Sequence, residues 1–359
     1  IDFDPKKRSW QAYRVESESE RAGRNTTTFD DDKTQSVIRF LVQIDKELHF
    51  KNETIREAAH YALGAVLQSQ YPCGAWPQKY NGNLVDPDSR SRQASFDKNW
   101  PLEFPNKSYQ TYYTLNDNTL CDLITTLLDA WDVYDDDRYL KAAQRGGDFL
   151  LLAQLPEPQP GWAQQYNRKM QPAWARRFEP PAITGGESQR VMRTLIELYR
   201  RTAAVDDQAD RYLKPLTRAI AYYKSLVLPD GRIARFYEIG TDRPLYFNKD
   251  YKLTYENDDL PTHYAFIVGA SFDSIGRELE SALKTPKDQL HVFKPARLER
   301  SPDFDRLVLK TIVDIDDRGA WVEPGKLKYQ GADDTTRSVI RSDTFSTNIQ
   351  VLAKWLAAK

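Results

Sequence analysis

The sequence is poor in cysteine and histidine, and this shortage excludes several classes of protein. It holds two cysteines, Cys73 and Cys121, and four histidines in 359 residues. Two cysteines cannot build a disulfide scaffold or a cysteine-cluster metal site, so we expect two small buried side chains. The histidines lack the His-Glu-x-x-His spacing of a zinc enzyme, and zinc catalysis is therefore not expected.

Long apolar runs and an excess of charge of one sign are also absent. No apolar run approaches the roughly 20 residues that a membrane-spanning helix needs. The 51 basic and 52 acidic residues give a net charge of −1, which offers little to displace counterions from nucleic-acid phosphates. We therefore expect neither a membrane nor a nucleic-acid partner. The chain starts at Ile1 without a signal peptide, which fits a processed exported protein or a trimmed chain.

Aromatic residues, in contrast, are plentiful, with 20 Tyr, 15 Phe and 8 Trp. Rings in such numbers serve core packing, or they line a groove in which a ligand such as a sugar ring stacks. Composition alone leaves both interpretations open.

The sequence pattern of a helical hairpin occurs three times along the chain. In each pair, apolar residues recur at helix spacing, and the second helix stops at a proline that is followed by a short aromatic segment. The pairs are 34–48 with 54–72, 118–134 with 138–156, and 187–202 with 211–229. Hairpins repeated at this spacing predict an all-α protein, a short α/α toroid or incomplete (α/α)3 barrel with long irregular loops. We expect one domain over 1–359, a loop insertion at about 81–113 and an irregular region at about 285–318.

Two of the aromatic segments are close copies of each other. "GAWPQKY" occupies 74–80 and "GWAQQY" occupies 161–166, each directly after a second helix. The repetition indicates packing at equivalent hairpin exits. It also places Trp76, Gln78, Trp162 and Gln164 at one rim of the toroid, where they could contact a ligand, and both roles stay open.

Acidic and amide side chains cluster before the first helix of each hairpin. "TFDDDKT" holds Asp30, Asp31 and Asp32, and "TLNDNT" holds Asn116 and Asp117. One such residue is enough to cap a helix N-terminus. Carboxylates that converge at one rim repel each other unless a cation or a shared proton lies between them. An oxygen-liganded cation, calcium above all, is the alternative to simple capping.

A polar stretch rich in arginine precedes the third hairpin. "WARRFEPP" at 174–181 contains Arg176, Arg177 and Glu179, and "IARFYEIGTDRP" places Arg235 at a corresponding point further on. An arginine–glutamate ion pair could hold this loop together. Alternatively, a guanidinium group at the rim could bind a carboxylate in a planar, bidentate way.

Taken together, these stretches resemble a known family. "TFDDDKT", "GAWPQKY", "TLNDN", "GWAQQY", "ARRFEPPAITGGES" and "ARFYEIGTDRP" stand in the order and at the spacings seen in polysaccharide lyase family 10, the pectate (pectic acid) lyases. The resemblance covers about residues 28–270. Its most specific element is "ARRFEP" followed closely by "GGES".

The resemblance implies a secreted or periplasmic carbon–oxygen lyase that degrades pectin. It implies cleavage of α-1,4-polygalacturonate by calcium-dependent β-elimination, with Arg176 as the catalytic base and Asp117 and Asp30 as the ligands of Ca2+. We expect the acidic polysaccharide to be bound by a further set of residues, and the enzyme to be a monomer. This set is Arg235, Lys249, Asn116, Trp162 and Gln164. Arginine can act as a base only if its pKa falls, and calcium with neighbouring cationic groups is expected to lower it.

Three positions depart from the family pattern and leave alternatives open. Leu152 stands where the family usually has lysine, Lys249 replaces an arginine, and Thr262 follows Pro261 where another arginine is expected. Fewer cationic contacts would suit subsites that prefer partly esterified or shorter chains, or a weakly active or non-catalytic protein that binds uronate polysaccharides. A third possibility is an inverting glycoside hydrolase that uses Asp30 and Asp117 as its acid and base.

Overall fold

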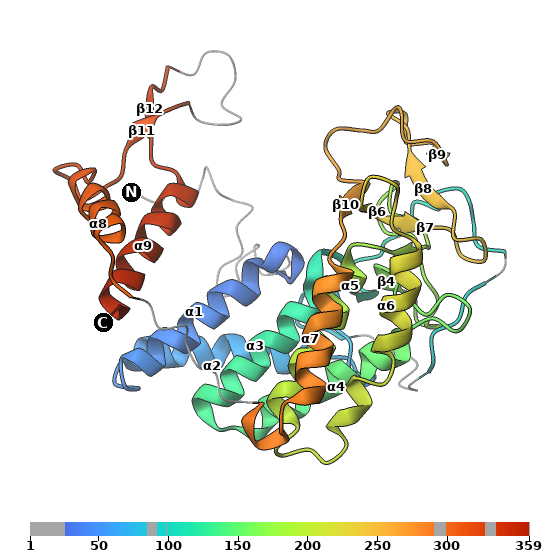
Figure 1. Cartoon of the computed structure of the whole chain (residues 1–359), viewed down its shortest axis with the longest axis horizontal. Helices are drawn as coiled ribbons and strands as arrows, with labels where there is room; N and C mark the ends of the chain where they lie inside the picture. The colour runs from blue at the N-terminus through green and yellow to red at the C-terminus, as the bar shows by residue number, and fades with distance from the viewer. Residues whose placement is uncertain (1–25, 85–91, 98, 291–298, 327–334, 359) are drawn as a thin grey trace. The chain divides into compact units, whose positions relative to one another are not determined.

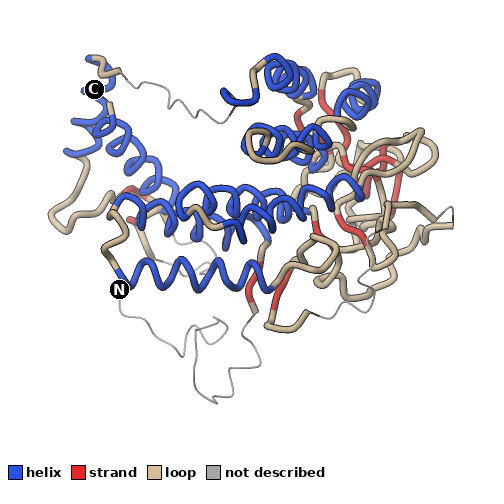
Figure 2. Tube along the Cα trace, turned by 90° about the horizontal axis from the view of Figure 1, so that it is seen from below, coloured by secondary structure: helices blue, strands red, loops and turns tan. Residues whose placement is uncertain are grey.

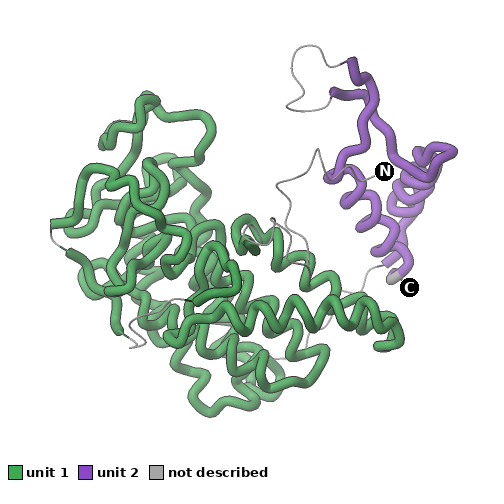
Figure 3. Tube along the Cα trace, turned by 180° about the vertical axis from the view of Figure 1, so that it is seen from behind, with its two compact units in different colours: residues 1–291 green, residues 292–359 purple. Residues whose placement is uncertain are grey.

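The computed structural model describes residues 26–84, 92–97, 99–290, 299–326 and 335–358. Within these residues the chain is mainly helical, with a few short strands (Figure 1). It divides into two compact units, residues 1–291 and 292–359, which Figure 3 shows in different colours. A single catalytic domain over 1–359 stays a prediction.

The first unit contains the three predicted hairpins. Figure 2 shows the helices of this unit, with most of the short strands near one end of them. The hairpins are α1 (Lys33–Glu47) with α2 (Glu53–Gln68), α3 (Thr119–Tyr134) with α4 (Asp137–Ala153), and α5 (Glu187–Thr202) with α6 (Leu216–Ser225), and α7 (Phe272–Lys284) packs against α5 and α6. The prediction for the third hairpin was wrong at one end, because 211–229 includes Pro215. Proline lacks the backbone N–H that a helix interior needs, and α6 begins directly after it.

Short antiparallel strands close each hairpin. The strand before the first helix pairs with the strand after the second helix of the same hairpin: β1 (Thr27–Thr28) with β2 (Lys79–Tyr80), β3 (Tyr113–Thr114) with β4 (Gln165–Tyr166), and β5 (Ile183–Thr184) with β7 (Phe236–Tyr237). The sheet of β5 and β7 continues into β8 (Pro244–Phe247) and β9 (Leu253–Thr254), and β6 (Arg232–Ala234) pairs with β10 (Ile267–Gly269). The strand pairing holds the starts of α1, α3 and α5 beside the hairpin exits.

The two tryptophans of the repeated aromatic segments are buried anchors of these exits. Trp76 and Trp162 are both 0% exposed. The indole N–H of Trp76 donates to the carbonyl of Val66 at 2.9 Å, and that of Trp162 donates to the carbonyl of Leu150 at 2.8 Å. Both carbonyls lie in the last turn of a second helix, where carbonyl groups have no partner within the helix. The repetition therefore has a packing role.

The described part of the insertion at about 81–113 has no helix, and its only strand is β3 at its end. The loop still packs on the hairpins, since the amide of Ala94 donates to the carbonyl of Leu152 at 2.7 Å. Both cysteines are buried, as predicted. Burial raises the pKa of the Cys121 thiol to about 12. Among the described helices, none combines the length and apolar character required to cross a bilayer.

The second unit holds a helix that the sequence-based prediction missed. α8 (Pro302–Val313) lies within the stretch predicted to be irregular, and its start is well defined because Ser301 caps the amide of Phe304 and proline occupies the first helical position. The chain then passes through β11 (Glu323–Pro324) and β12 (Ser338–Val339) to α9 (Ser342–Ala357). The indole of Trp321 donates to the carbonyl of Thr311 at 2.7 Å, which repeats the anchor seen in the first unit.

Candidate active site

The starts of α1, α3 and α5 each carry an acidic residue. The turns that precede α1 and α3 have the same backbone conformation. The 3-10 turns η2 (Asp30–Asp32) and η3 (Asn116–Asn118) contact each other. Each contains two successive residues with positive φ, 54° and 55° in η2 and 48° and 60° in η3. Asp and Asn tolerate this left-handed conformation better than other residues with a side chain, which explains why both turns consist of them.

Helix capping does not use the acidic side chains of these turns. The N-cap residues of α1, α3 and α5 are Asp32, Asn118 and Gly186, and none makes a side-chain capping hydrogen bond. Asp32 instead pairs with Arg39 at 2.5 Å. Of the two interpretations drawn from the sequence, capping is therefore the one that the geometry does not support.

Asp30 and Asp117 form a close acidic pair. One carboxylate oxygen from each of Asp30, Asp31 and Asp117 lies within 4.8 Å of the others. Burial, followed by the hydrogen bond and charge of Asp30, raises the pKa of Asp117 to about 7. Asp31 is more exposed and pairs with Lys33 at 2.7 Å. Like charges at this spacing need a cation or a proton between them.

The oxygen atoms around this pair fit a calcium ion. Oδ1 of Asp30 and Oδ1 of Asn116 are buried and accept no hydrogen bond from the residues that the structure describes. Buried oxygens without a donor are costly unless something else pairs with them. Carboxylate and amide oxygens are also the ligands that calcium prefers. The donor set of Asp30, Asp117 and Asn116 thus suits a hard cation.

Arg176 lies beside the acidic pair and is anchored by Glu179. Its Nη2 atom is 2.5 Å from Oε1 of Glu179 and 3.9 Å from Oδ2 of Asp117. Its backbone N–H donates to the second oxygen of Glu179 at 3.0 Å. The sequence left two alternatives for this arginine, an ion pair that holds the loop and a guanidinium placed to bind a carboxylate. The ion pair with Glu179 is present, and the half-exposed guanidinium also lies near the carboxylate of Asp117.

The expected fall in the pKa of Arg176 is not seen. Burial lowers this pKa, but the hydrogen bond and charge of Glu179 outweigh burial, so that the pKa lies above its usual value. The prediction assumed calcium together with cationic neighbours, whereas the protein groups closest to the guanidinium are the carboxylates of Glu179 and Asp117.

A second ion pair, between Arg235 and Glu187, adjoins the first. Nη1 of Arg235 is 2.8 Å from Oε1 of Glu187, and the same oxygen accepts a hydrogen bond from Gln164 at 2.8 Å. The hydroxyl of Tyr264 donates to Glu179 at 3.1 Å and accepts from Gln164 at 3.2 Å. The guanidinium carbons of Arg176 and Arg235 lie 5.5 and 4.8 Å from the centre of its ring. Tyr264 therefore joins the two ion pairs.

A family model described as pectic acid lyase matches residues 4–264. The chain belongs to the pectic acid lyase family.

Solved structures agree with this assignment at the level of the fold. A family 10 polysaccharide lyase from Cellvibrio cellulosa is 21% identical, with 72% of this chain and 81% of that chain covered and a TM-score of 0.54. An aspartate-to-alanine mutant of the family 10 lyase from that organism, in complex with trigalacturonic acid, gives the same identity and TM-score, and covers 72% of this chain and 82% of its own. No curated protein matches the chain. The predicted α/α toroid is thereby confirmed.

Most residues predicted for the site of this pectic acid lyase are close together. Asn116 is buried and donates from Nδ2 to Asp117 at 3.0 Å, and Gln164 and Arg235 belong to the network of Glu187. Glu187 and Tyr264 were missed. An acid directly after two glycines at a helix start was a usable signal for Glu187, but a single tyrosine in "HYAF" carried none.

Two predicted substrate-binding residues do not belong to this group. Trp162 is fully buried with its indole N–H already bonded, so its side chain offers no surface to a ligand, and the predicted contact does not fit its burial. Lys249 follows β8 and is exposed, and its ammonium pairs with Asp259 at 2.7 Å. Among the described residues, neither Lys249 nor Asp259 has an interaction with the acidic pair or with Arg176.

Proposed function

We propose that this pectic acid lyase cleaves α-1,4-linked polygalacturonate by β-elimination, with calcium bound by Asp30 and Asp117 and with Arg176 as the base. The observation that carries the proposal is the convergence of these three residues from two hairpins and a loop, with the guanidinium 3.9 Å from one carboxylate of the acidic pair. Family membership and the trigalacturonic acid bound to a lyase of the same fold support this substrate class. A polymeric substrate of this kind also favours a secreted or periplasmic enzyme.

Calcium would be held by Asp30 and Asp117, with the unpartnered Oδ1 of Asn116 as a further ligand. An ion held there would bind the carboxylate of a uronate, and it would supply stabilisation of the negative charge that develops in the transition state. The pKa of Asp117 is raised to about 7. Near neutral pH the acidic pair can therefore lose its proton and bind a cation in its place.

The reaction breaks the C5–H and C4–O bonds and forms a double bond between C4 and C5. The base takes the C5 proton, the electron pair of the C5–H bond forms the double bond, and the departing oxygen takes up a proton from water as the C4–O bond breaks. Arg176 lies half-exposed at the acidic pair, where a uronate would bind. Because Glu179 raises the pKa of Arg176, the proposal requires substrate binding to weaken the Arg176–Glu179 contact, so that the guanidinium gives one proton to solvent before it takes the C5 proton.

Arg235 is suited to hold a substrate carboxylate. Its side chain is only 17% exposed and is fixed by Glu187 and by the carbonyl of Ala265 at 2.8 Å. A guanidinium that is already oriented loses little entropy when it binds a second carboxylate. The hydrogen bond from Gln164 to Glu187 keeps the carboxylate partner in place.

Hydrolysis by Asp30 and Asp117 fits the geometry less well. Inverting hydrolases leave about 6.5–9.5 Å between their two carboxyl groups to make room for a water molecule. The oxygens of Asp30 and Asp117 lie within 4.8 Å of each other.

Ultraviolet absorbance tests the proposal, because the conjugated double bond of the product absorbs and a hydrolysis product does not. Incubation with polygalacturonate and calcium should raise the absorbance, and a chelator should abolish the rise. Arg176→Ala should lose about 100- to 10,000-fold in kcat, which is the typical contribution of general base catalysis, and should keep most of its affinity.

Arg177→Ala is the matched control, because this neighbouring arginine is exposed and contacts Asp250 and Tyr251. It should retain most of the activity. Reducing ends without absorbance would support a hydrolase, binding with neither signal would leave a non-catalytic binding protein, and an active Arg176→Ala variant would remove Arg176 from the role of base.

A further inference from the structure

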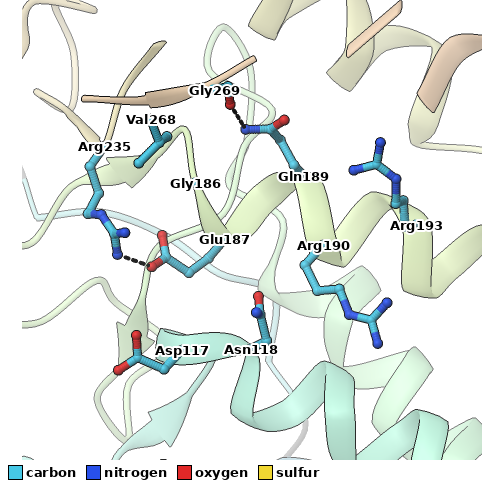
Figure 4. A pocket seen from close by; sticks show the side chains of 10 residues that line it. All are labelled: Asp117, Asn118, Gly186, Glu187, Gln189, Arg190, Arg193, Arg235, Val268 and Gly269. Carbon is cyan, nitrogen blue, oxygen red and sulfur yellow. Dashed lines mark hydrogen bonds and ion pairs between the residues drawn. The ribbon is translucent and has the colours of Figure 1, made fainter. Parts of the chain in front are cut away.

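A pocket of about 340 Å3 extends from Asp117, one member of the acidic pair, along the first two turns of α5. Asp117 and Glu187 stand at one side of it, and Arg190 and Arg193 stand at the other (Figure 4). Its volume is at the lower end of the range of about 300–1,000 Å3 that small-molecule sites occupy. The sequence analysis did not predict a binding role for Arg190 or Arg193.

The helix itself sets the spacing of the charged groups. Glu187, Arg190 and Arg193 follow one another at intervals of three residues, which places them near one face of α5. Each interval advances about 4.5 Å along the helix axis. The two arginine positions therefore step away from Glu187 along the helix axis in increments comparable to the length of one sugar unit.

Both arginines are held in place and still have donors to offer. Nη2 of Arg190 donates to Asp122 at 3.0 Å and to Thr125 at 3.2 Å. Arg193 donates from Nε to Glu278 at 3.2 Å and from Nη1 to Ser271 at 3.1 Å. A guanidinium has five N–H donors, and no hydrogen bond among the described residues uses Nε or Nη1 of Arg190 or Nη2 of Arg193.

The exposure of the two side chains agrees with a binding role. They are 32% and 30% exposed, although both are tied to neighbouring helices. Ion pairs that only join helices would explain the contacts with Asp122 and Glu278. They would not require free N–H groups on the wall of a pocket that begins at the acidic pair.

We infer that Arg190 and Arg193 form a subsite for the carboxylate of a second acidic sugar, next to the sugar that is cleaved. The inference rests on the proposed function for the position of the first sugar. It goes further by making two neighbouring free carboxylates the preferred substrate, so that a methyl ester at the second sugar weakens binding. The arginines bind this carboxylate through charge-assisted hydrogen bonds.

Gly269 offers a way to block the subsite without removing any contact. It lies in β10 on the wall of the pocket, and a Cβ built on it meets no atom within 4 Å. Gly269→Asp and Gly269→Asn add side chains of nearly equal size, and only the first adds a negative charge. Binding of an acidic chain should be weaker in Gly269→Asp than in Gly269→Asn.

Titration calorimetry with hexagalacturonate tests the arginines directly, in an Arg176→Ala background that limits turnover. Arg190→Gln and Arg193→Gln should each lower the affinity about ten-fold or more, since a hydrogen bond to a charged group is involved. Arg201→Gln is the matched control, because Arg201 also lies on α5 and pairs with Asp129 and Asp132 but does not line the pocket. Fully methyl-esterified hexagalacturonate should bind equally well to all these variants.

The outcomes separate the subsite from the proposed function. Unchanged affinity in Arg190→Gln and Arg193→Gln, or an equal loss in Arg201→Gln, would overturn the subsite even if the wild-type enzyme is an active lyase. If the two variants lose affinity as expected but the wild-type protein has no lyase activity, the proposed chemistry is overturned and the subsite stands.

Discussion

Replacing Asp117 by asparagine should stabilise the metal-free protein at alkaline pH, although it removes a residue of the proposed active site. The pKa of Asp117 is raised from 3.8 to about 7, mainly by burial and then by Asp30. Between these two values the folded state binds more protons than the unfolded chain. The free energy of unfolding therefore falls as the pH rises from about 4 to 7, and the penalty is complete above pH 7.

The size of the effect follows from the pKa. A change from 3.8 to about 7 corresponds to at most about 4 kcal/mol of lost stability. Water reaches the Asp117 side chain, which is 27% exposed, so we expect the gain from Asp117→Asn to be about 1–2 kcal/mol after screening. For a unit of this size, that gain raises the melting temperature by about 2–8 °C.

Thermal unfolding in the presence of a chelator measures this gain. Asp117→Asn should melt above the wild type at pH 8 and at the same temperature near pH 4. Asp207→Asn, at an exposed site on another loop, should change neither value. Added calcium should stabilise the wild type by binding its folded state, and this gain should be small in Asp117→Asn. A variant that melts at or below the wild type at pH 8, or a difference that persists at pH 4, would refute the reasoning.

Two further substitutions separate packing from catalysis. Trp162→Phe should lower the free energy of unfolding by about 1–3 kcal/mol, because the carbonyl of Leu150 loses its buried donor. Its kcat/KM on polygalacturonate should stay within about two-fold of the wild type. A large kinetic loss in a folded variant would instead support the predicted contact between Trp162 and the substrate. Tyr264→Phe keeps the ring beside both guanidinium groups but removes the hydroxyl that joins Glu179 to Gln164. Its kcat/KM should fall about ten-fold, or about 1.4 kcal/mol, and unchanged kinetics would show that this link is dispensable.

The sequence could predict those parts of the fold that are encoded by a repeating pattern of residues. Apolar residues at helix spacing located the three hairpins, and equivalent places in a repeat lie at the same rim, which is why the convergence of Asp30 and Asp117 was predictable. α8 was missed although Phe304, Val308 and Ile312 recur at helix spacing within it and Ser301 caps its start. The helix stands outside the three repeated hairpins and within a charged stretch, so neither its periodicity nor its capping was recognised.

The partners of the arginines were beyond such reasoning. Tyr264 lies 85 positions after Glu179 and donates to it, and nothing in the spacing of a non-repeated loop indicates that contact. The pKa of Arg176 illustrates the consequence. Its direction depends on the sign of the nearest charge, and Glu179 was considered only as a partner that might hold the loop, whereas it also sets the electrostatics of the proposed base.

The repeated tryptophans show how packing and function are connected in this toroid. Each indole is fixed to the last turn of its own hairpin, and the backbone carbonyl of the same residue accepts a hydrogen bond from the strand that enters the next hairpin. The carbonyl of Trp76 accepts from Thr114 at 3.1 Å, and that of Trp162 accepts from Thr184 at 2.8 Å. Asp117 and Glu187 each follow three residues later. A fully buried tryptophan thus helps to set the position of an acidic group of the candidate site, through the hydrogen bond that its backbone carbonyl accepts from the entering strand.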